Sequence, residues 1–170
     1  MTDKRASRFA LPDERPPGLD SPHTVKLIKY MAKVNVWAFK LTNGRIGSKW
    51  RIGAGFRKPV PTLLLEHIGR KSGTTFTTPL LYLRDGADLV IVASQGGLPK
   101  NPQWFANLIA QPETRVHLRK ERGRPVKARV ATSDERAALW PRLVDLYADF
   151  AKYARWTERE IPVVILEPRS

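Results

Sequence analysis

The stretch 62-TLLLEHIGRKSGTTFTTPLLYL-83 decides the fold. Two runs rich in β-branched and large apolar residues, 62–68 and 74–83, flank the short segment GRKSG at 69–73. Runs of this kind, bounded by turn-forming residues, predict two strands that pair as a hairpin. The hairpin tip places an Arg and a Lys beside a tight turn. It therefore either binds an anion or is a solvated basic turn.

A second feature that suits an anion follows the hairpin. The apolar run DLVIVAS at 88–94 predicts a third strand, and two glycines and the segment KNPQWFAN at 100–107 come directly after it. Asn101 is a favourable N-cap and Pro102 a favourable first helical residue, so we expect a helix to begin there. The free N–H groups of that helix start favour an anion near the strand end.

Length and composition limit the possible classes of protein. The chain has 170 residues, of which 42% are hydrophobic, which is enough for one domain with a buried core. A formal net charge of +14 indicates a polyanionic partner, such as nucleic acid, an anionic membrane or a charged small molecule. The chain has no cysteine and no apolar run long enough to span a membrane. We expect a cytoplasmic protein.

The N-terminal third differs in character from the rest. Residues 1–20 are charged and proline-rich and are expected to be a disordered leader. Residues 21–60 are expected to form a basic amphipathic helix, which begins at Ser21-Pro22 and ends near Leu41, followed by a loop. Apolar residues share one face of this helix and lysines gather opposite; the apolar set is Leu27, Ile28, Met31, Val34, Ala38 and Leu41.

Three interpretations of this basic segment stay open. Between residues 21 and 65 there are nine Lys or Arg and no Asp or Glu. The helix either covers the barrel with its apolar face or lies on anionic lipid at the inner face of the cell membrane. A nucleic-acid surface is a third possibility, but no nucleic-acid-binding motif accompanies the charge.

The remaining segments complete a mainly β (α+β) fold over residues 61–170. Runs at 114–119 and 126–131 predict a second hairpin around 121–124, and 162–167 predicts a last, buried strand. Thr132 and Glu135 form a capping box for a helix that reaches Leu146. An aromatic stripe follows at a spacing of three: Tyr147, Phe150, Tyr153 and Trp156. Hairpins with inserted helices favour an antiparallel β-barrel with covering helices.

Several reaction types lack the residues that they need. The glycines match neither a dinucleotide fingerprint nor a phosphate-binding P-loop, and Ser72 and Ser94 lie in no nucleophile elbow. His23, His67 and His117 are scattered, so we expect no metal site and give them structural or surface roles. The protein therefore either only binds a ligand or uses a cofactor that carries the reaction.

The motifs together resemble the deazaflavin-dependent nitroreductase family, whose members are split β-barrel proteins that bind coenzyme F420. The resemblance covers about residues 61–168 and extends to the branch that includes the mycobacterial enzyme that activates bicyclic nitroimidazole drugs; an actinobacterial origin is expected. The motifs that carry it are GRKSG at 69–73, TPL at 78–80, AS at 93–94 with GG at 96–97, KNPQWFANL at 100–108, ER at 135–136 and IPV at 161–163.

By this resemblance the loop residues Arg70, Lys71 and Ser72 meet the phosphate and glutamyl tail of F420. The deazaflavin is lined by two neighbouring strands, and the short helix and the aromatic stripe close the pocket. The residues implied in this lining are Phe76, Thr77, Thr78, Pro79, Leu80, Leu81, Val92, Ala93, Ser94, Gln95, Gln103, Trp104, Phe105, Asn107 and Phe150. Phe76, Gln95 and Phe150 stand where family members often carry a basic residue, a Lys and a Tyr.

The resemblance implies an F420H2-dependent oxidoreductase that transfers a hydride to a quinone, an enone or a nitro-type acceptor. Tyr153 and Tyr147 are the expected proton donors, and Ser94 is expected to hydrogen-bond the cofactor. The acceptor is expected to be a small apolar molecule such as a quinone. The alternative is a protein that binds or sequesters F420 without catalysis, or a basic module that binds a membrane or nucleic-acid surface.

Overall fold

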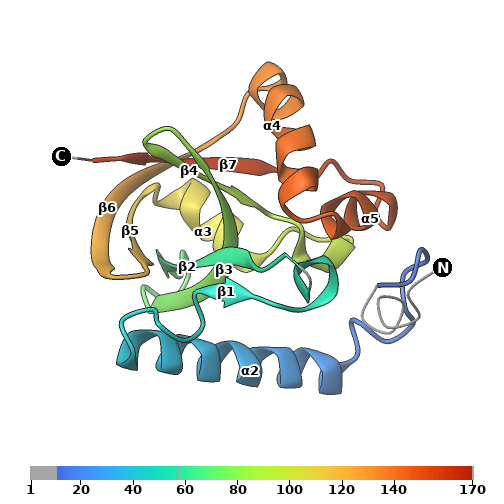
Figure 1. Cartoon of the computed structure of the whole chain (residues 1–170), viewed down its shortest axis with the longest axis horizontal. Coiled ribbons are helices and arrows are strands. Elements are labelled where there is room, and N and C mark those ends of the chain that lie inside the picture. The colour runs from blue at the N-terminus through green and yellow to red at the C-terminus, as the bar shows by residue number, and fades with distance from the viewer. Residues whose placement is uncertain (1–10, 57, 170) are drawn as a thin grey trace.

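The computed structural model describes residues 11–56 and 58–169, and it contains the expected helices and strands in the expected order, together with a two-residue strand at 49–50 that was not expected (Figure 1). The strands are β1 Lys49–Trp50, β2 Val60–Ile68, β3 Thr75–Asp85, β4 Asp88–Val92, β5 Glu113–Leu118, β6 Glu121–Val130 and β7 Val163–Pro168. The helices are α2 Pro22–Leu41, α3 Gln103–Ala110, α4 Ser133–Leu146 and α5 Asp149–Arg155, with the short 3₁₀ helices η1 Gly53–Phe56 and η2 Gln95–Gly97.

The strands form an antiparallel barrel. Their order is β1-β2-β3-β4-β7-β6-β5, and β2 also pairs with β5. This second pairing joins the two ends of the sheet, so the strands β2 to β7 close on themselves and β1 extends one edge. The hairpin expected around residues 69–73 is present, with β2 and β3 in register from Thr62↔Leu81 to Ile68↔Thr75. The predicted split barrel with covering helices is confirmed.

Two hydrophobic layers use opposite faces of the same strands. Leu89 and Ile91 of β4 point into the barrel, where they pack with Trp104 of α3. Val90 and Val92 point outward and pack under α4 and α5, where Phe150 lies. Side chains alternate along a strand, so a strand buried on both faces needs a continuous apolar run. The run at 88–94 meets this requirement.

The turn between β5 and β6 differs from the prediction. Residues 121–124, expected to be the turn, lie inside β6, and the chain reverses at Arg119 and Lys120 because Leu118 pairs with Glu121. Lys120, the second residue of this turn, has a φ of 66°, in the left-handed region. Gly123 has a φ of 67° opposite a shift in strand register, which is typical of a β-bulge. The short turn lets the strands pair over more backbone groups than the predicted loop allows.

Helix α2 lies along the outside of the barrel beside β1 and β3 (Figure 1), with its apolar face turned to solvent. Leu27 is 58% exposed and Trp37 is 66% exposed, and Phe39 is the buried residue of the helix. Polar contacts help to hold its C-terminal end, where Arg122 donates to Asn43 Oδ1 at 3.1 Å and to the Lys40 carbonyl. The interpretation that the Leu27 face packs on the barrel is therefore wrong.

Residues 11–20 form no helix or strand, and Leu11 and Asp13 contact α5 and its C-cap residue. Lys152 donates to the Leu11 carbonyl, and the indole of Trp156 donates to the Asp13 carbonyl at 2.8 Å. These are contacts that a disordered leader would lack. The other half of the expected leader, residues 1–10, lies outside the described residues.

A pair of leucine substitutions tests the difference between the barrel core and the α2 face. Leu65→Ala removes a fully buried side chain, so we expect the free energy of unfolding to fall by about 2–5 kcal/mol. Leu27→Ala removes a side chain that is already exposed, so we expect a change within about 0.5 kcal/mol. Urea unfolding of both variants measures the difference, and equal losses would contradict the orientation of α2.

Candidate functional site

The β2–β3 turn presents two cations on an ordered backbone. The Gly69 N–H donates to the Thr74 carbonyl at 2.8 Å, and the Gly73 N–H donates to the Gly69 carbonyl at 2.7 Å. A Cβ on Gly69 would lie 2.5 Å from Ser72 Oγ and 2.9 Å from the Phe76 ring, so a larger residue here would have to displace both side chains. Arg70 and Lys71 are exposed, and no acidic group in the described part of the chain forms a salt bridge with either. An ordered turn with unneutralised cations suits an anionic ligand.

A chain of hydrogen bonds joins this turn to α3, β2 and β3. The Arg70 N–H donates to Asn107 Oδ1 at 3.2 Å, and Asn107 Nδ2 lies 3.0 Å from His67 Nδ1. His67 Nε2 lies 3.0 Å from Thr78 Oγ1, and its ring stacks on Phe76 with a centroid separation of 5.6 Å. Burial lowers the pKa of His67 below its ordinary value. The structure therefore brings three predicted site residues, Arg70, Asn107 and Thr78, into one network.

His67 is a residue that sequence reasoning missed at this place. It shares strand parity with Leu63 and Leu65, which point into the barrel, and it is 6% exposed. A buried polar side chain needs hydrogen-bond partners. The signal that could have found it is therefore a histidine at an inward-facing strand position, separated from the cationic turn by Ile68 alone.

Strand β3 keeps accessible surface along its length. It pairs with β2 on one side and β4 on the other, yet each residue from Thr77 to Leu83 keeps part of its surface accessible. Leu80 packs toward the barrel interior and Leu81 packs on the layer beneath α4 and α5. The residues expected to line a deazaflavin therefore lie on a strand whose faces are not fully covered by protein.

The end of β4 is held by Arg159. Its guanidinium donates to the carbonyl oxygens of Ala93, Ser94 and Leu98 at 2.8–3.2 Å. The Ser94 hydroxyl is half-buried and has no hydrogen-bond partner among the described residues, so it is available to a ligand. Arg159 thus positions a predicted site residue, and nothing in its own sequence neighbourhood indicates this role.

The expected helix cap at Asn101 is wrong. Helix α3 begins at Gln103, its N-cap residue is Pro102, and no side chain caps it. The Asn101 carboxamide oxygen instead accepts a hydrogen bond of 2.6 Å from Arg159 Nη1. A bond from a charged guanidinium is stronger than a neutral one, so the arginine takes the oxygen that would have capped the helix.

The aromatic stripe forms a packed cluster around two phenol groups. Tyr147 packs edge-on against Phe150 with ring centroids 5.1 Å apart, and the hydroxyls of Tyr147 and Tyr153 lie 3.4 Å apart. Burial raises the pKa of both tyrosines, so both keep their O–H at neutral pH. Asp149, buried beside them, accepts a hydrogen bond from the Ala54 N–H at 2.8 Å. The cluster therefore holds two protonated hydroxyls beside a buried carboxylate.

Helix α5 brings this cluster to the end of β4. A Cβ on Gly97 would lie 2.8 Å from the Tyr153 carbonyl and 3.0 Å from the Trp156 side chain, so the backbone of η2 touches α5. Tyr153 and Ser94 thus belong to one assembly, and Arg70, Asn107 and Thr78 belong to another. No hydrogen bond between side chains in the described ranges links the two assemblies directly.

Several predicted site residues are buried and shape the site from behind. Their side chains are accessible over less than a tenth of their surface, and they pack in the two hydrophobic layers or in the His67 network: Val92, Ala93, Trp104, Asn107, Tyr147 and Phe150. The partly or fully exposed ones are Arg70, Lys71, Ser72, Phe76, Thr77, Thr78, Pro79, Leu80, Leu81, Ser94, Gln95, Gln103, Phe105 and Tyr153. A ligand meets this second set first.

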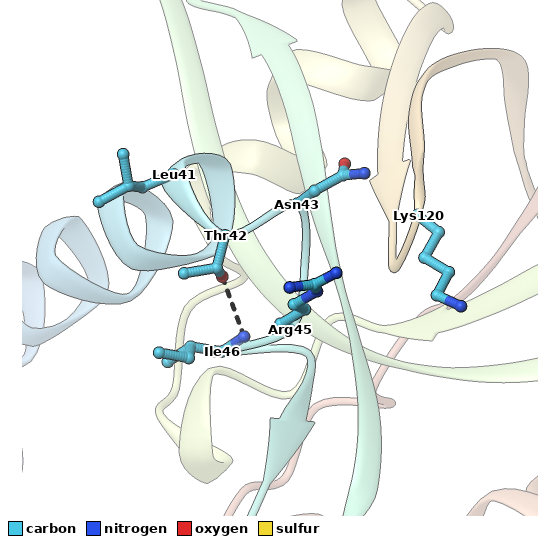
Figure 2. Close-up of a pocket in the computed structure, with 6 residues that line it drawn as sticks. All are labelled: Leu41, Thr42, Asn43, Arg45, Ile46 and Lys120. Atoms are coloured by element: carbon cyan, nitrogen blue, oxygen red, sulfur yellow. Dashed lines mark hydrogen bonds between the residues drawn. The ribbon is translucent and has the colours of Figure 1, made fainter.

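One cavity, of about 620 Å³, lies away from all of these residues. It is at the C-terminal end of α2 and is lined by Leu41, Thr42, Asn43, Arg45, Ile46 and Lys120 (Figure 2). The Ile46 N–H donates to Thr42 Oγ1 at 3.0 Å, which fixes the loop that forms its wall. Its position beside exposed Leu41 and Ile46 connects this cavity with the α2 surface.

Comparison with known proteins shows the family. The model of the F420H(2)-dependent quinone reductase family matches residues 31–168. The chain belongs to this family. The F420H(2)-dependent quinone reductase family consists of oxidoreductases that use coenzyme F420, so the expected cofactor, enzyme class and reduction of a quinone are confirmed.

Two relatives from Mycobacterium tuberculosis are similar to this chain over most of its length. One carries the provisional name of an F420H(2)-dependent quinone reductase. It is 60% identical over 70% of this chain and 99% of its own length. Another F420H(2)-dependent quinone reductase is 36% identical over 77% of this chain and 85% of its own.

Solved structures agree with the barrel of the family. An F420-H2 dependent reductase, FDR-A, has a TM-score of 0.58 and 34% identity, over 63% of this chain and 94% of that chain. A protein described as a domain-swapped dimer has a TM-score of 0.62 and 27% identity, over 85% of this chain and 99% of that chain.

Proposed function

We propose that the Gly69–Gly73 loop binds the anionic tail of F420 and that Thr77–Leu81 of β3 line its ring. The observation that carries this proposal is the pair of unneutralised cations, Arg70 and Lys71, at the end of a strand that keeps open surface. Arg70 can hold a phosphate or carboxylate through two parallel N–H donors, and Lys71 adds a point charge. Ser94, which follows the neighbouring strand β4, and the residues of helix α3 border the same region.

The residues of this chain would supply orientation and a proton. Reduced F420, when bound, is the source of the hydride. A quinone that accepts a hydride needs one proton to become a hydroquinone, and we assign this proton to the Tyr153 hydroxyl. Tyr147 lies 3.4 Å behind it and can return a proton to Tyr153. Burial raises the pKa of each phenol, so both hydroxyls stay protonated well above neutral pH.

The proposed acceptor is a small apolar quinone, with enones and nitro compounds as weaker alternatives. The proposed proton donor lies among aromatic rings, with Phe150 and Trp156 centred 6.4 and 5.5 Å from Tyr153. An aromatic wall binds a flat apolar ring by stacking and excludes water from the reacting atoms.

Charge removal at the loop tests the cofactor site. We expect Arg70→Ala and Lys71→Ala each to weaken F420 binding by about 1–3 kcal/mol, because each removes a charge-assisted contact. Lys127→Ala, an exposed cation on β6, is the matched control and should leave binding unchanged. Fluorescence titration of the cofactor measures all three. Unchanged affinity in both loop variants would place the tail elsewhere.

Removal of one phenol tests the proton donor. We expect Tyr153→Phe to lower quinone turnover at least about tenfold while F420 affinity changes little, because a proton donor acts in the transition state. Steady-state kinetics and cofactor titration together give the two numbers. An equal loss in both would assign Tyr153 to packing. Tight F420 binding without oxidation of F420H2 by any quinone would instead favour a cofactor-sequestering protein.

We further propose that α2 docks the enzyme on an anionic phospholipid surface. No helix among residues 11–56 and 58–169 is long and apolar enough to cross a bilayer. The α2 surface carries a solvent-exposed apolar stripe of Leu27, Tyr30, Met31, Val34, Trp37 and Leu41. A contiguous exposed apolar patch on a soluble protein marks an interaction surface.

Charge selects lipid as the occupant of this stripe. Lys26, Lys29, Lys33 and Lys40 form a row along one side of the stripe, at helical spacing, and all four are exposed. Arg45 and Lys120 continue the row around the cavity of Figure 2, whose apolar lining includes Leu41 and Ile46. Each cation near an anionic leaflet contributes about 1 kcal/mol, and Trp37 is a suitable interfacial anchor.

Vesicle sedimentation tests the docking. We expect the protein to pellet with phosphatidylglycerol vesicles at low salt, to be released as salt screens the charges, and to ignore phosphatidylcholine vesicles. The double variant Leu27→Ser with Trp37→Ser should weaken pelleting at least about tenfold and keep its F420 affinity. Val130→Thr, at an exposed apolar position on β6, is the matched control. Equal pelleting with both lipids, or a dimer in solution that the double variant dissociates, would contradict the proposal.

A further inference from the structure

We propose that His67 is a positioning residue of the cofactor site, which fixes the Gly69–Gly73 loop on α3 through Asn107 and directs the Thr78 hydroxyl toward the bound cofactor. This inference rests on the assignment of that loop to the cofactor tail. His67 would act by holding the loop in place and not by contacting the cofactor, because the imidazole lies behind the loop and beneath Phe76.

The direction of each hydrogen bond follows from the first donor. The Arg70 N–H can only donate, so the oxygen of the Asn107 carboxamide faces the loop. The carboxamide NH2 group then faces His67 Nδ1, which must carry a lone pair. The proton of the neutral ring is therefore on Nε2, which donates to Thr78 Oγ1. One tautomer of His67 satisfies all three partners.

The Thr78 hydroxyl is left with a hydrogen to donate. Its oxygen accepts from His67, and no acceptor for its own hydrogen is found among residues 11–56 and 58–169. Thr78 is half-buried on the stretch of β3 that keeps open surface. A ligand acceptor that lies along β3 would take this hydrogen, so His67 would set the direction of a cofactor contact that it does not make itself.

Protonation of His67 breaks this arrangement. An imidazolium has N–H groups at both nitrogens, so Nδ1–H would face the Asn107 NH2 group at 3.0 Å. Rotation of the carboxamide would relieve that clash only by turning its NH2 group toward the Arg70 N–H. In either orientation of the carboxamide Asn107 therefore loses one of its two partners, His67 Nδ1 or the Arg70 N–H, and the rotated orientation releases the loop from α3.

No acidic group in the described part of the chain forms a hydrogen bond with His67. The groups that contact His67 from β3 and α3 are Phe76, Thr78 and Asn107, none of which titrates near neutral pH. Glu66 points to the other face of β2, where it bonds His117, and the charged side chains of the adjacent loop are cations. Burial accordingly lowers the pKa of His67 below 6.5, so the neutral form dominates at pH 7 and is lost as the pH falls through that lowered pKa.

Nuclear magnetic resonance of the protein without cofactor tests the geometry alone. We expect the ring nitrogens of His67 to show the Nε2–H tautomer at pH 7.5, and the Arg70 amide to be protected from hydrogen exchange. In His67→Leu, which cannot hold Asn107, the Arg70 protection factor should fall at least about tenfold while the protection of core β4 amides is kept. An Nδ1–H tautomer, or unchanged Arg70 protection, would overturn the proposal.

Cofactor titration against pH tests the role. We expect wild-type F420 affinity to fall by up to about tenfold per pH unit below the pKa of His67, because one proton is released on binding. His67→Gln keeps a hydrogen-bonding amide that does not titrate, so its affinity should be flat from pH 7.5 to 5. His117→Gln, which removes the histidine on the other face of β2, is the matched control and should keep the wild-type pH profile.

The outcomes separate the two proposals. If F420 binding weakens in Arg70→Ala but its pH dependence is the same in the wild type and in His67→Gln, the role of His67 is refuted and the tail site stands. Binding that is insensitive to Arg70 and Lys71 would refute the tail site, and the tautomer and exchange measurements would still decide whether His67 holds the loop.

Discussion

The pairing of β2 on both sides is the constraint on which the rest of the structure depends. Leu64 and Leu65 face Pro79 and Thr78 of β3 on one edge and His117 and Val116 of β5 on the other. With both edges paired, the side chains of β2 can only alternate between the barrel interior and the outer face. The same alternation that packs Leu63 and Leu65 inside therefore puts His67 inside, directly before the cationic loop.

Barrel closure also divides the proposed site between two supports. One support is the hydrogen-bonded network of Arg70, Asn107, His67 and Thr78, which links strands to α3. The other is the aromatic layer in which Tyr153 lies, with Arg159 holding the end of β4. Neither contains an activated nucleophile, and a reaction in which the cofactor brings the hydride needs none. In the proposed mechanism the protein has to orient two flat molecules and supply one proton.

Local signals in the sequence predicted local structure well. The hairpin at 62–83, the capping box at Thr132 and the aromatic stripe are encoded by neighbouring residues, and the structure contains all three. Asn101 misled the prediction because its partner, Arg159, is 58 positions away. The His67–Asn107 contact spans 40 positions and stayed hidden for the same reason. Patterning likewise did not predict β1, which is only two residues long and depends on β2 for its pairing.

Periodicity shows that a helix has an apolar face but not the direction in which that face points. In α2 the stripe from Leu27 to Leu41 faces away from the barrel, although hydrophobic burial would favour the reverse. The exposed stripe and its row of lysines together suit a surface that is apolar inside and anionic outside. Lys40 reaches Thr77 of β3 at 3.4 Å, so α2 touches the strand proposed to line the cofactor. A bilayer bound by α2 would thus be separated by the width of one helix from the strand where reduction is proposed to occur.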